Sequence, residues 1–117
     1  MTETDFATAI KTEAYDAAVV DAIQLLRNPP GAKPRPELVR LSDWFLSLPE
    51  SDQQMVADAV RLGALGAAFG VLAMLDGVRV WENSQKGDLR ILSSDGTDLN
   101  PNHDLHDRFR YAIDSEL

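Results

Sequence analysis

Two histidines, His103 and His106, are the residues of this chain best suited to chemistry, and both lie among acidic residues. His103 and Asp107 are one helical turn apart, so His103, His106 and Asp107 could serve one metal ion or acid–base chemistry. A transition-metal site needs three or four converging ligands, and one short helix does not make these converge. Asp76 or Glu82 would have to complete the site. We therefore expect surface histidines beside first-turn acids, with no metal and no cofactor.

Other catalytic and ligand-binding patterns are weak or missing. Asp98-x-Asn100-x-Asn102 resembles the start of a calcium loop, but His103 stands where that loop needs glycine and Phe109 where it needs glutamate. The chain contains no G-x-S-x-G, no H-E-x-x-H and no phosphate-binding glycine loop. We therefore predict no catalytic residue. The alternative is a small-ligand or metal-dependent enzyme centred on His103, His106 and Asp107.

The charge of the chain favours a protein partner. With 11 basic and 19 acidic residues the net charge is −8, which argues against binding to nucleic acid or to an anionic membrane. The acids are densest near the C-terminal end, where Asp95, Asp98, Asp104 and Asp107 are the predicted binding residues. Such a surface suits a partner with a basic surface, and charge complementarity would speed their encounter.

One uncharged stretch, Leu62 to Leu75, determines the expected architecture. Its sequence, LGALGAAFGVLAML, is too long for an ordinary strand and shorter than the about 20 residues that span a bilayer. A helix that is apolar on all sides is normally buried, and its many Gly and Ala residues allow neighbouring helices to approach closely. We therefore expect the central core helix of a soluble protein, not a membrane helix.

Four helices and one hairpin are expected around this stretch. The helices are predicted at 4–28, at 36–47, from 49–51 through the apolar stretch, and at 101–115. Pro36 suits a first helical position, Ser47 and Pro49 mark a break, and Asn100 can cap the last helix. In the first, Phe6 and Ile10 lie nearly opposite the later apolar residues, so this helix should contact two neighbours or bend. Residues 77–82 could continue the third helix to Glu82, which we prefer, or form a turn and a short strand. A β-hairpin is predicted at 88–100 around an Asp95-Gly96 turn.

Three segments carry a resemblance to other proteins. FGVLAMLDGVR (69–79), GDLRIL (87–92) and LHDRF (105–109) resemble a group of small acidic bacterial proteins of uncharacterised function, over the chain from Leu41 onward. The resemblance implies a small, mainly helical domain and no activity.

These observations predict a single mainly α domain over residues 1–117, with four helices around a central apolar helix and one small β-hairpin before the last helix. The chain contains no cysteine and its N-terminal stretch has no secretory signal, so we expect a cytoplasmic protein. The leading function is a non-catalytic protein-binding module with an acidic surface, of which an immunity-like protein is one version. A structural homodimer subunit is a further alternative to the enzyme.

Overall fold

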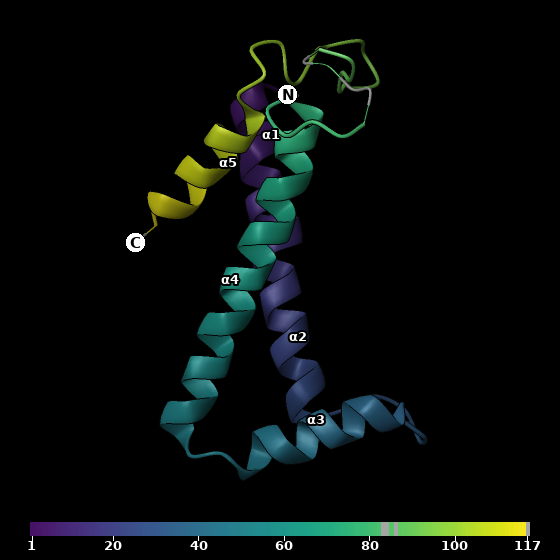
Figure 1. Ribbon diagram of the computed structural model, residues 1–117, viewed down its shortest axis with the longest axis vertical. Helices are drawn as coiled ribbons and strands as arrows, with labels where there is room; N and C mark the ends of the chain where they lie inside the picture. The colour runs from purple at the N-terminus through teal and green to yellow at the C-terminus, as the bar shows by residue number, and fades with distance from the viewer. Residues whose placement is uncertain (83–84, 86, 117) are drawn as a thin grey trace.

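The computed structural model describes residues 1–82, 85 and 87–116, and it is mainly helical, as predicted. Its segments are α1 (Glu3–Ile10), η1 (Lys11–Asp16, a π-helix), α2 (Ala17–Arg27), α3 (Pro36–Ser47), α4 (Glu50–Leu75) and α5 (Leu105–Asp114). Figure 1 shows α2 and α4 diverging from a narrow end, where α1 and α5 lie, to a wide end that α3 crosses. The protein is thus an elongated frame with extents of 48 × 32 × 27 Å.

The segments α1, η1 and α2 form one continuous helix, close to the predicted 4–28. It begins at a capping box, in which the Asp5 N–H donates to Thr2 Oγ1 and the Thr2 N–H donates to Asp5 Oδ2. The π-turn of η1 brings residues five apart onto one face. Ile10 and Tyr15 are five apart, and both pack against the core. The π-turn therefore realigns the two apolar faces that the sequence places on opposite sides.

The bounds of α3 are those predicted, 36–47, with a proline at its first position. The Ser42 hydroxyl donates to the Leu26 carbonyl, 2.5 Å away, and fixes α3 against the end of α2. Phe45 is fully buried, and the Arg27 guanidinium lies 5.3 Å from the centre of its ring. The side-chain amide of Gln53 donates to the Phe45 carbonyl and holds the corner between α3 and α4.

Our preference for a helix continuing to Glu82 is wrong, because α4 ends at Leu75. Gly77 has φ 78°, a left-handed conformation that glycine adopts without strain. Its N–H donates to the Met74 carbonyl, and the Val78 N–H donates to the Ala73 carbonyl. This pair of bonds is the Schellman motif, which satisfies the last carbonyls of a helix and turns the chain away from its axis.

The predicted β-hairpin is also wrong: the described residues contain no strand, and only Leu92 and Asp98 form an isolated bridge. The chain does reverse at Asp95-Gly96, but side chains occupy the backbone donors that a strand ladder would use. Asn100 Oδ1 accepts from the Ile91 N–H, and Asp95 Oδ1 accepts from the Thr97 N–H. Asn and Asp side chains compete with backbone pairing in this way, and a lone two-stranded hairpin is marginal in water.

The last helix begins four residues later than predicted, at Leu105. Asn100, the expected cap, uses its side chain elsewhere: Oδ1 binds the Ile91 N–H and Nδ2 donates to the Leu75 carbonyl. His103 then takes a positive φ of 54°, which interrupts a right-handed helix. Residues 101–104 therefore form a turn that leads into α5.

The main core lies at the narrow end. Ala7, Leu72, Leu105 and Phe109 are buried together there, and further apolar side chains from α1, α4 and α5 pack around them. Tyr15 meets Phe109 edge to face, with ring centres 6.3 Å apart. The wide end has fewer buried side chains, so the frame is packed unevenly along its length.

The expected central helix, buried on all sides, is wrong. Of the 26 residues of α4 only Ala57, Gly70, Leu72 and Ala73 are buried. Leu62 is 73% exposed, and a Cβ added at Gly63 or Gly66 would meet no atom within 4 Å. The neighbours of α4 leave one of its faces uncovered, so its small residues do not mark close packing within this chain.

Candidate functional sites

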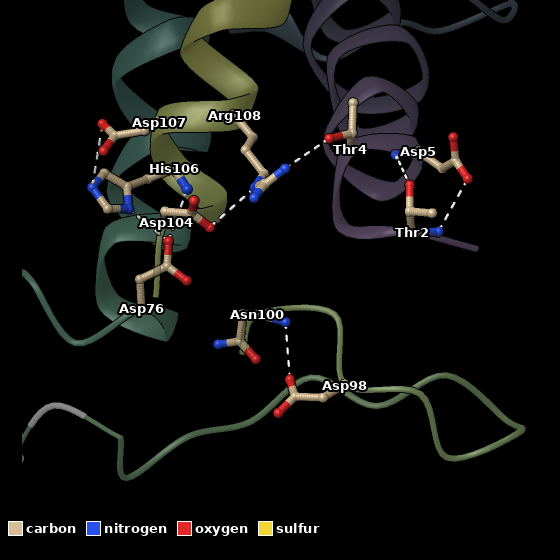
Figure 2. A network of polar contacts seen from close by, with 10 residues as sticks. All are labelled: Thr2, Thr4, Asp5, Asp76, Asp98, Asn100, Asp104, His106, Asp107 and Arg108. Carbon is tan, nitrogen blue, oxygen red and sulfur yellow. Dashed lines mark hydrogen bonds and ion pairs between the residues drawn. The ribbon is translucent and has the colours of Figure 1, made fainter. Parts of the chain in front are cut away.

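The two histidines are placed differently, and Asp76 decides the role of one of them. Asp76 follows α4 and is fully buried, and its Oδ2 lies 2.6 Å from Nδ1 of His106 in the first turn of α5. The same oxygen accepts the backbone N–H of His106 at 2.8 Å. Figure 2 shows both contacts converging on Asp76. Asp76 thus caps α5 from the end of another helix, while Asp104 at the cap position makes no capping bond.

This Asp–His pair has the form of a general base, but its surroundings suit a structural link. His106 is buried, and Phe69 meets its ring edge to face with centres 5.4 Å apart. Nε2, the nitrogen that would act on a substrate, lies 3.5 Å from Asp107 Oδ1. Neither Asp76 nor His106 lines the cavity at the wide end between α2, α3 and α4. We therefore treat the pair as a latch between α4 and α5.

His103 stands apart from this latch in its contacts. Its ring lies against Gly87, with Cε1 3.8 Å from where a Cβ would stand on that glycine. Its Nδ1 is buried without a hydrogen-bond partner in the described part of the chain. Across residues 1–82, 85 and 87–116, no three His, Asp or Glu side chains are grouped to hold a metal ion. The alternative set of His103, His106 and Asp107 therefore lacks the convergence that a metal site requires.

Asp95, a predicted binding residue, is engaged within its own loop. Its Oδ1 accepts from the Thr97 N–H at 3.0 Å and the Thr97 hydroxyl at 2.7 Å, and also from the Ser93 hydroxyl. The hydrogen bonds from Ser93 and Thr97 hold the pKa of this carboxyl well below its usual range. The carboxylate is therefore ionised and oriented by its own turn.

Two other predicted acids are paired with arginines. Asp98 accepts the Asn100 N–H at 3.0 Å and two N–H groups of Arg90, and these contacts, the Asn100 bond foremost, lower its pKa. Asp104 pairs with Arg108 at 3.1 Å, and this arginine also donates to Thr4 in α1 (Figure 2). Asp107, by contrast, has a mostly exposed side chain. The arginines offset much of the negative field near Asp98 and Asp104, so the binding role of the four acids stays a prediction.

Lys11 was not singled out by its sequence context, and it is buried in the π-turn. Its Nζ lies 2.7 Å from Asp16, five residues on, and also contacts Glu116 beyond α5. The hydrogen bonds that Lys11 donates to Asp16, and then to Glu116, raise the pKa of Lys11. Since π-helical hydrogen bonds also join residues five apart, this ion pair stabilises the turn that realigns the first helix.

A cavity of about 290 Å³ lies at the wide end between α2, α3 and α4. Its wall includes apolar Val19, Ile23 and Phe45, and two arginines, Arg27 and Arg61, with no carboxylate in the lining. Arg61 is paired with Asp58 at 3.0 Å, and the Arg27 guanidinium lies over the ring of Phe45.

An exposed apolar band runs along α4, and we call it the α4 stripe. Its members are exposed and uncharged, and successive members follow helical spacing: Met55, Ala59, Leu62, Gly63, Gly66, Ala67, Val71 and Met74. The stripe runs about 28 Å along the helix. Soluble monomers rarely expose contiguous apolar patches of more than a few hundred Å².

The length and composition of α4 also meet those of a membrane-crossing helix, with 17% of its most apolar 18-residue window buried. A mostly buried core helix passes the same test, but most of α4 is uncovered, and two features argue against a membrane-crossing helix. The uncharged part, residues 62–75, is about 21 Å long, whereas a hydrocarbon layer is about 30 Å thick. Asp58 and Arg61 precede it within the same helix and form an ion pair at 3.0 Å.

Comparison with protein families, with characterised proteins and with solved structures finds no match to this chain. The resemblance carried by residues 69–79, 87–92 and 105–109 therefore stays a prediction. In the structure these segments supply Asp76 and Gly77 at the end of α4, Ile91 against the core, and His106 in α5. They are the residues of the latch and of the narrow end.

Proposed function

We propose that this protein is a non-catalytic protein-binding module, and that the α4 stripe is its binding surface. The observation that carries the proposal is the exposure of the longest apolar helix of the chain, with Leu62 73% and Val71 57% exposed. Burying such side chains in a partner is favourable by about 25 cal/mol per Å² of apolar surface. In an isolated monomer these side chains stay in water and do not gain this free energy.

The surface area of the chain supports the same conclusion. The chain exposes 7757 Å², whereas a compact monomer of 12.9 kDa exposes about 6300 Å². Its radius of gyration is 17.5 Å against about 13 Å for a compact domain of this length. The excess, about 1400 Å², is larger than the roughly 800 Å² that each partner buries in a standard interface.

The charge distribution limits the role of the acids to steering. Asp95, Asp98 and Asp104 are each bound to groups of their own chain, so they are poor candidates for direct contacts. The net charge of −8 still acts at a distance of about 8 Å in physiological salt. We propose a cytoplasmic setting, in which a basic partner would approach faster and an acidic one more slowly.

Photo-crosslinking in cells that make the protein tests this proposal. A benzophenone side chain replaces Leu62 in one variant and Tyr111 of α5 in the other, since the two residues are 73% and 74% exposed. We expect a protein adduct from position 62 and none from position 111. If position 62 gives no protein adduct, or the two positions give the same adducts, the α4 stripe is not a protein-binding surface.

A further inference from the structure

We infer that the partner of the α4 stripe is a second copy of this chain, with the two α4 helices packed antiparallel across a twofold axis between Gly66 and Ala67. This inference rests on the proposed function and names its partner. A twofold interface is formed by one surface patch paired with itself, so the patch must be self-complementary. The order of side chains along the stripe meets this condition.

The sizes of the side chains are symmetric about that axis. Near the axis the stripe has only small residues, Gly63, Gly66 and Ala67, where two crossing helices come closest. Larger residues stand at equal distances from this centre, Leu62 on one flank of the contact and Val71 on the other, since nine residues make two and a half turns of a helix. One step further out, Ala59 would face Met74, so a small residue meets a large one where the helices separate.

The open space at the centre has no use within a single chain. A Cβ at Gly63 or Gly66 would meet nothing within 4 Å, although each glycine costs a helix about 1 kcal/mol relative to alanine. Glycines on an exposed helix face let a second backbone approach closely. At Gly70 the Arg79 guanidinium already lies across the helix, with Nη1 2.6 Å from where a Cβ would stand. The uncovered centre is therefore limited to Gly63, Gly66 and Ala67.

The area and charge of the chain agree with a dimer. An excess of about 1400 Å² on each of two copies corresponds to the 2,000–5,000 Å² class of obligate homodimer interfaces. From Leu62 to Leu75 the helix itself carries no charge, and the charged group in the contact is the Arg79 guanidinium, which lies over Gly70 and would face Gly63 of the second copy. Each chain has net charge −8, and the copies repel at long range. Added salt should therefore tighten a homodimer, whereas it would weaken a complex with a basic partner.

The test is the mass of the purified protein by sedimentation equilibrium over a wide concentration range, at low and high salt. We expect a mass approaching twice 12.9 kDa, with tighter association at high salt. Leu62→Glu should weaken association about 100-fold or more by placing a carboxylate in the apolar contact. The control Tyr111→Glu adds the same charge at an equally exposed residue and should leave association within about twofold.

Two further variants separate contact from charge and test the direction of the helices. Gly66→Leu adds no charge and meets open space within one chain, so it should fold normally and still weaken the dimer by blocking close approach. Ala59→Glu should weaken the dimer and Met74→Lys in the same chain should restore association, because position 74 of one copy faces position 59 of the other only when the helices are antiparallel.

Each other outcome rejects the dimer in a distinct way. A parent protein that remains at 12.9 kDa at every concentration and salt overturns this inference, and so does a dimer indifferent to Leu62→Glu and Gly66→Leu. If the parent is monomeric but position 62 cross-links to a different protein, the proposed function stands without this partner. Binding of the monomer to neutral phosphatidylcholine vesicles, lost in Leu62→Glu, would reject both.

Discussion

Replacing Asp76 with alanine should destabilise the protein more than any change to its exposed acids. Asp76 is fully buried, and its Oδ2 accepts two bonds from His106, one from the backbone N–H at 2.8 Å and one from Nδ1 at 2.6 Å. A hydrogen bond to a charged group contributes about 1.5–3 kcal/mol, and loss of a helix cap costs about 1 kcal/mol. The bond to the backbone N–H is itself the cap, so its contribution is counted once, and together with the bond to Nδ1 we expect a loss of about 3–4 kcal/mol in the free energy of unfolding. That is a large part of the about 5–15 kcal/mol that stabilises a typical domain.

Urea unfolding followed by far-ultraviolet circular dichroism and tryptophan fluorescence measures this loss. In thermal unfolding, Asp76→Ala should also lower the melting temperature on the order of 10 °C, and it should reduce helical content at the α5 end. Asp107→Ala is the matched control, since its side chain is 74% exposed and lies 3.5 Å from the other ring nitrogen of His106. It should change the unfolding free energy by under about 1 kcal/mol.

His106→Ala distinguishes a latch from a simple cap. Asp76 Oδ1 has no hydrogen-bond partner in the described part of the chain, so His106 is the residue that compensates the buried carboxylate. Removing its ring leaves that charge with a single backbone donor, and the loss should equal or exceed that of Asp76→Ala. The reasoning is refuted if Asp76→Ala and His106→Ala both unfold at the same urea concentration as Asp107→Ala.

Three further predictions concern glycine, pH and metal. At concentrations where the chain is monomeric, Gly63→Ala should stabilise it by about 0.5–1 kcal/mol, because Gly63 is helical with open space around it. Gly77→Ala should destabilise the chain by about 1 kcal/mol, because Gly77 has φ 78°. Equal effects of the two substitutions in thermal melts would contradict this. The pKa of Asp95 is lower in the folded chain than its value of about 4 in the unfolded chain, so its ionised carboxylate stabilises the fold above about pH 4. This stability is lost as the pH falls through the folded-state pKa. Asp95→Asn should therefore be less stable than the parent at about pH 6 and equally stable in acid. Zinc or nickel should leave the melting temperature unchanged. A metal bound at 100 times its dissociation constant would add about 2.7 kcal/mol to the free energy of unfolding. A rise in melting temperature that His106→Ala abolishes would support a metal site at His106.

Helix boundaries were predicted well where the residues that start and stop the helix lie within a few positions of one another. Pro36 at a first helical position and the Ser47–Pro49 break set the bounds of α3, which are those expected. The Asp76-Gly77 turn that ends α4 was also visible, but the apolar residues after Gly77 favoured a longer helix in our interpretation. The helix ends in a Schellman motif instead of continuing past Gly77, because this motif satisfies two carbonyls of α4 at once.

The errors arose where side chains distant in sequence decide the structure. Asn100 was expected to cap the last helix, and it instead bonds to Ile91 and Leu75, which removes both the cap and the strand ladder. Asp76 then caps α5 from 30 residues away, a pairing that no local pattern reveals. The composition of residues 62–75 showed an apolar helix, but composition alone does not tell whether neighbours come from the same chain or from another.

Disulfide formation between single cysteines placed on α4 tests the central claim most directly. The chain contains no cysteine, so each variant has one thiol. Position 67 lies beside the proposed axis, and Ala67→Cys should cross-link to a second copy of itself under mild oxidation. Two copies of Met55→Cys would stand roughly 34 Å apart along the helices and should not cross-link. Mixing Ala59→Cys with Met74→Cys should cross-link the two variants to each other, because those positions face each other in the antiparallel pair. Cross-linking of Met55→Cys to itself, or failure of Ala67→Cys to cross-link, would contradict the account.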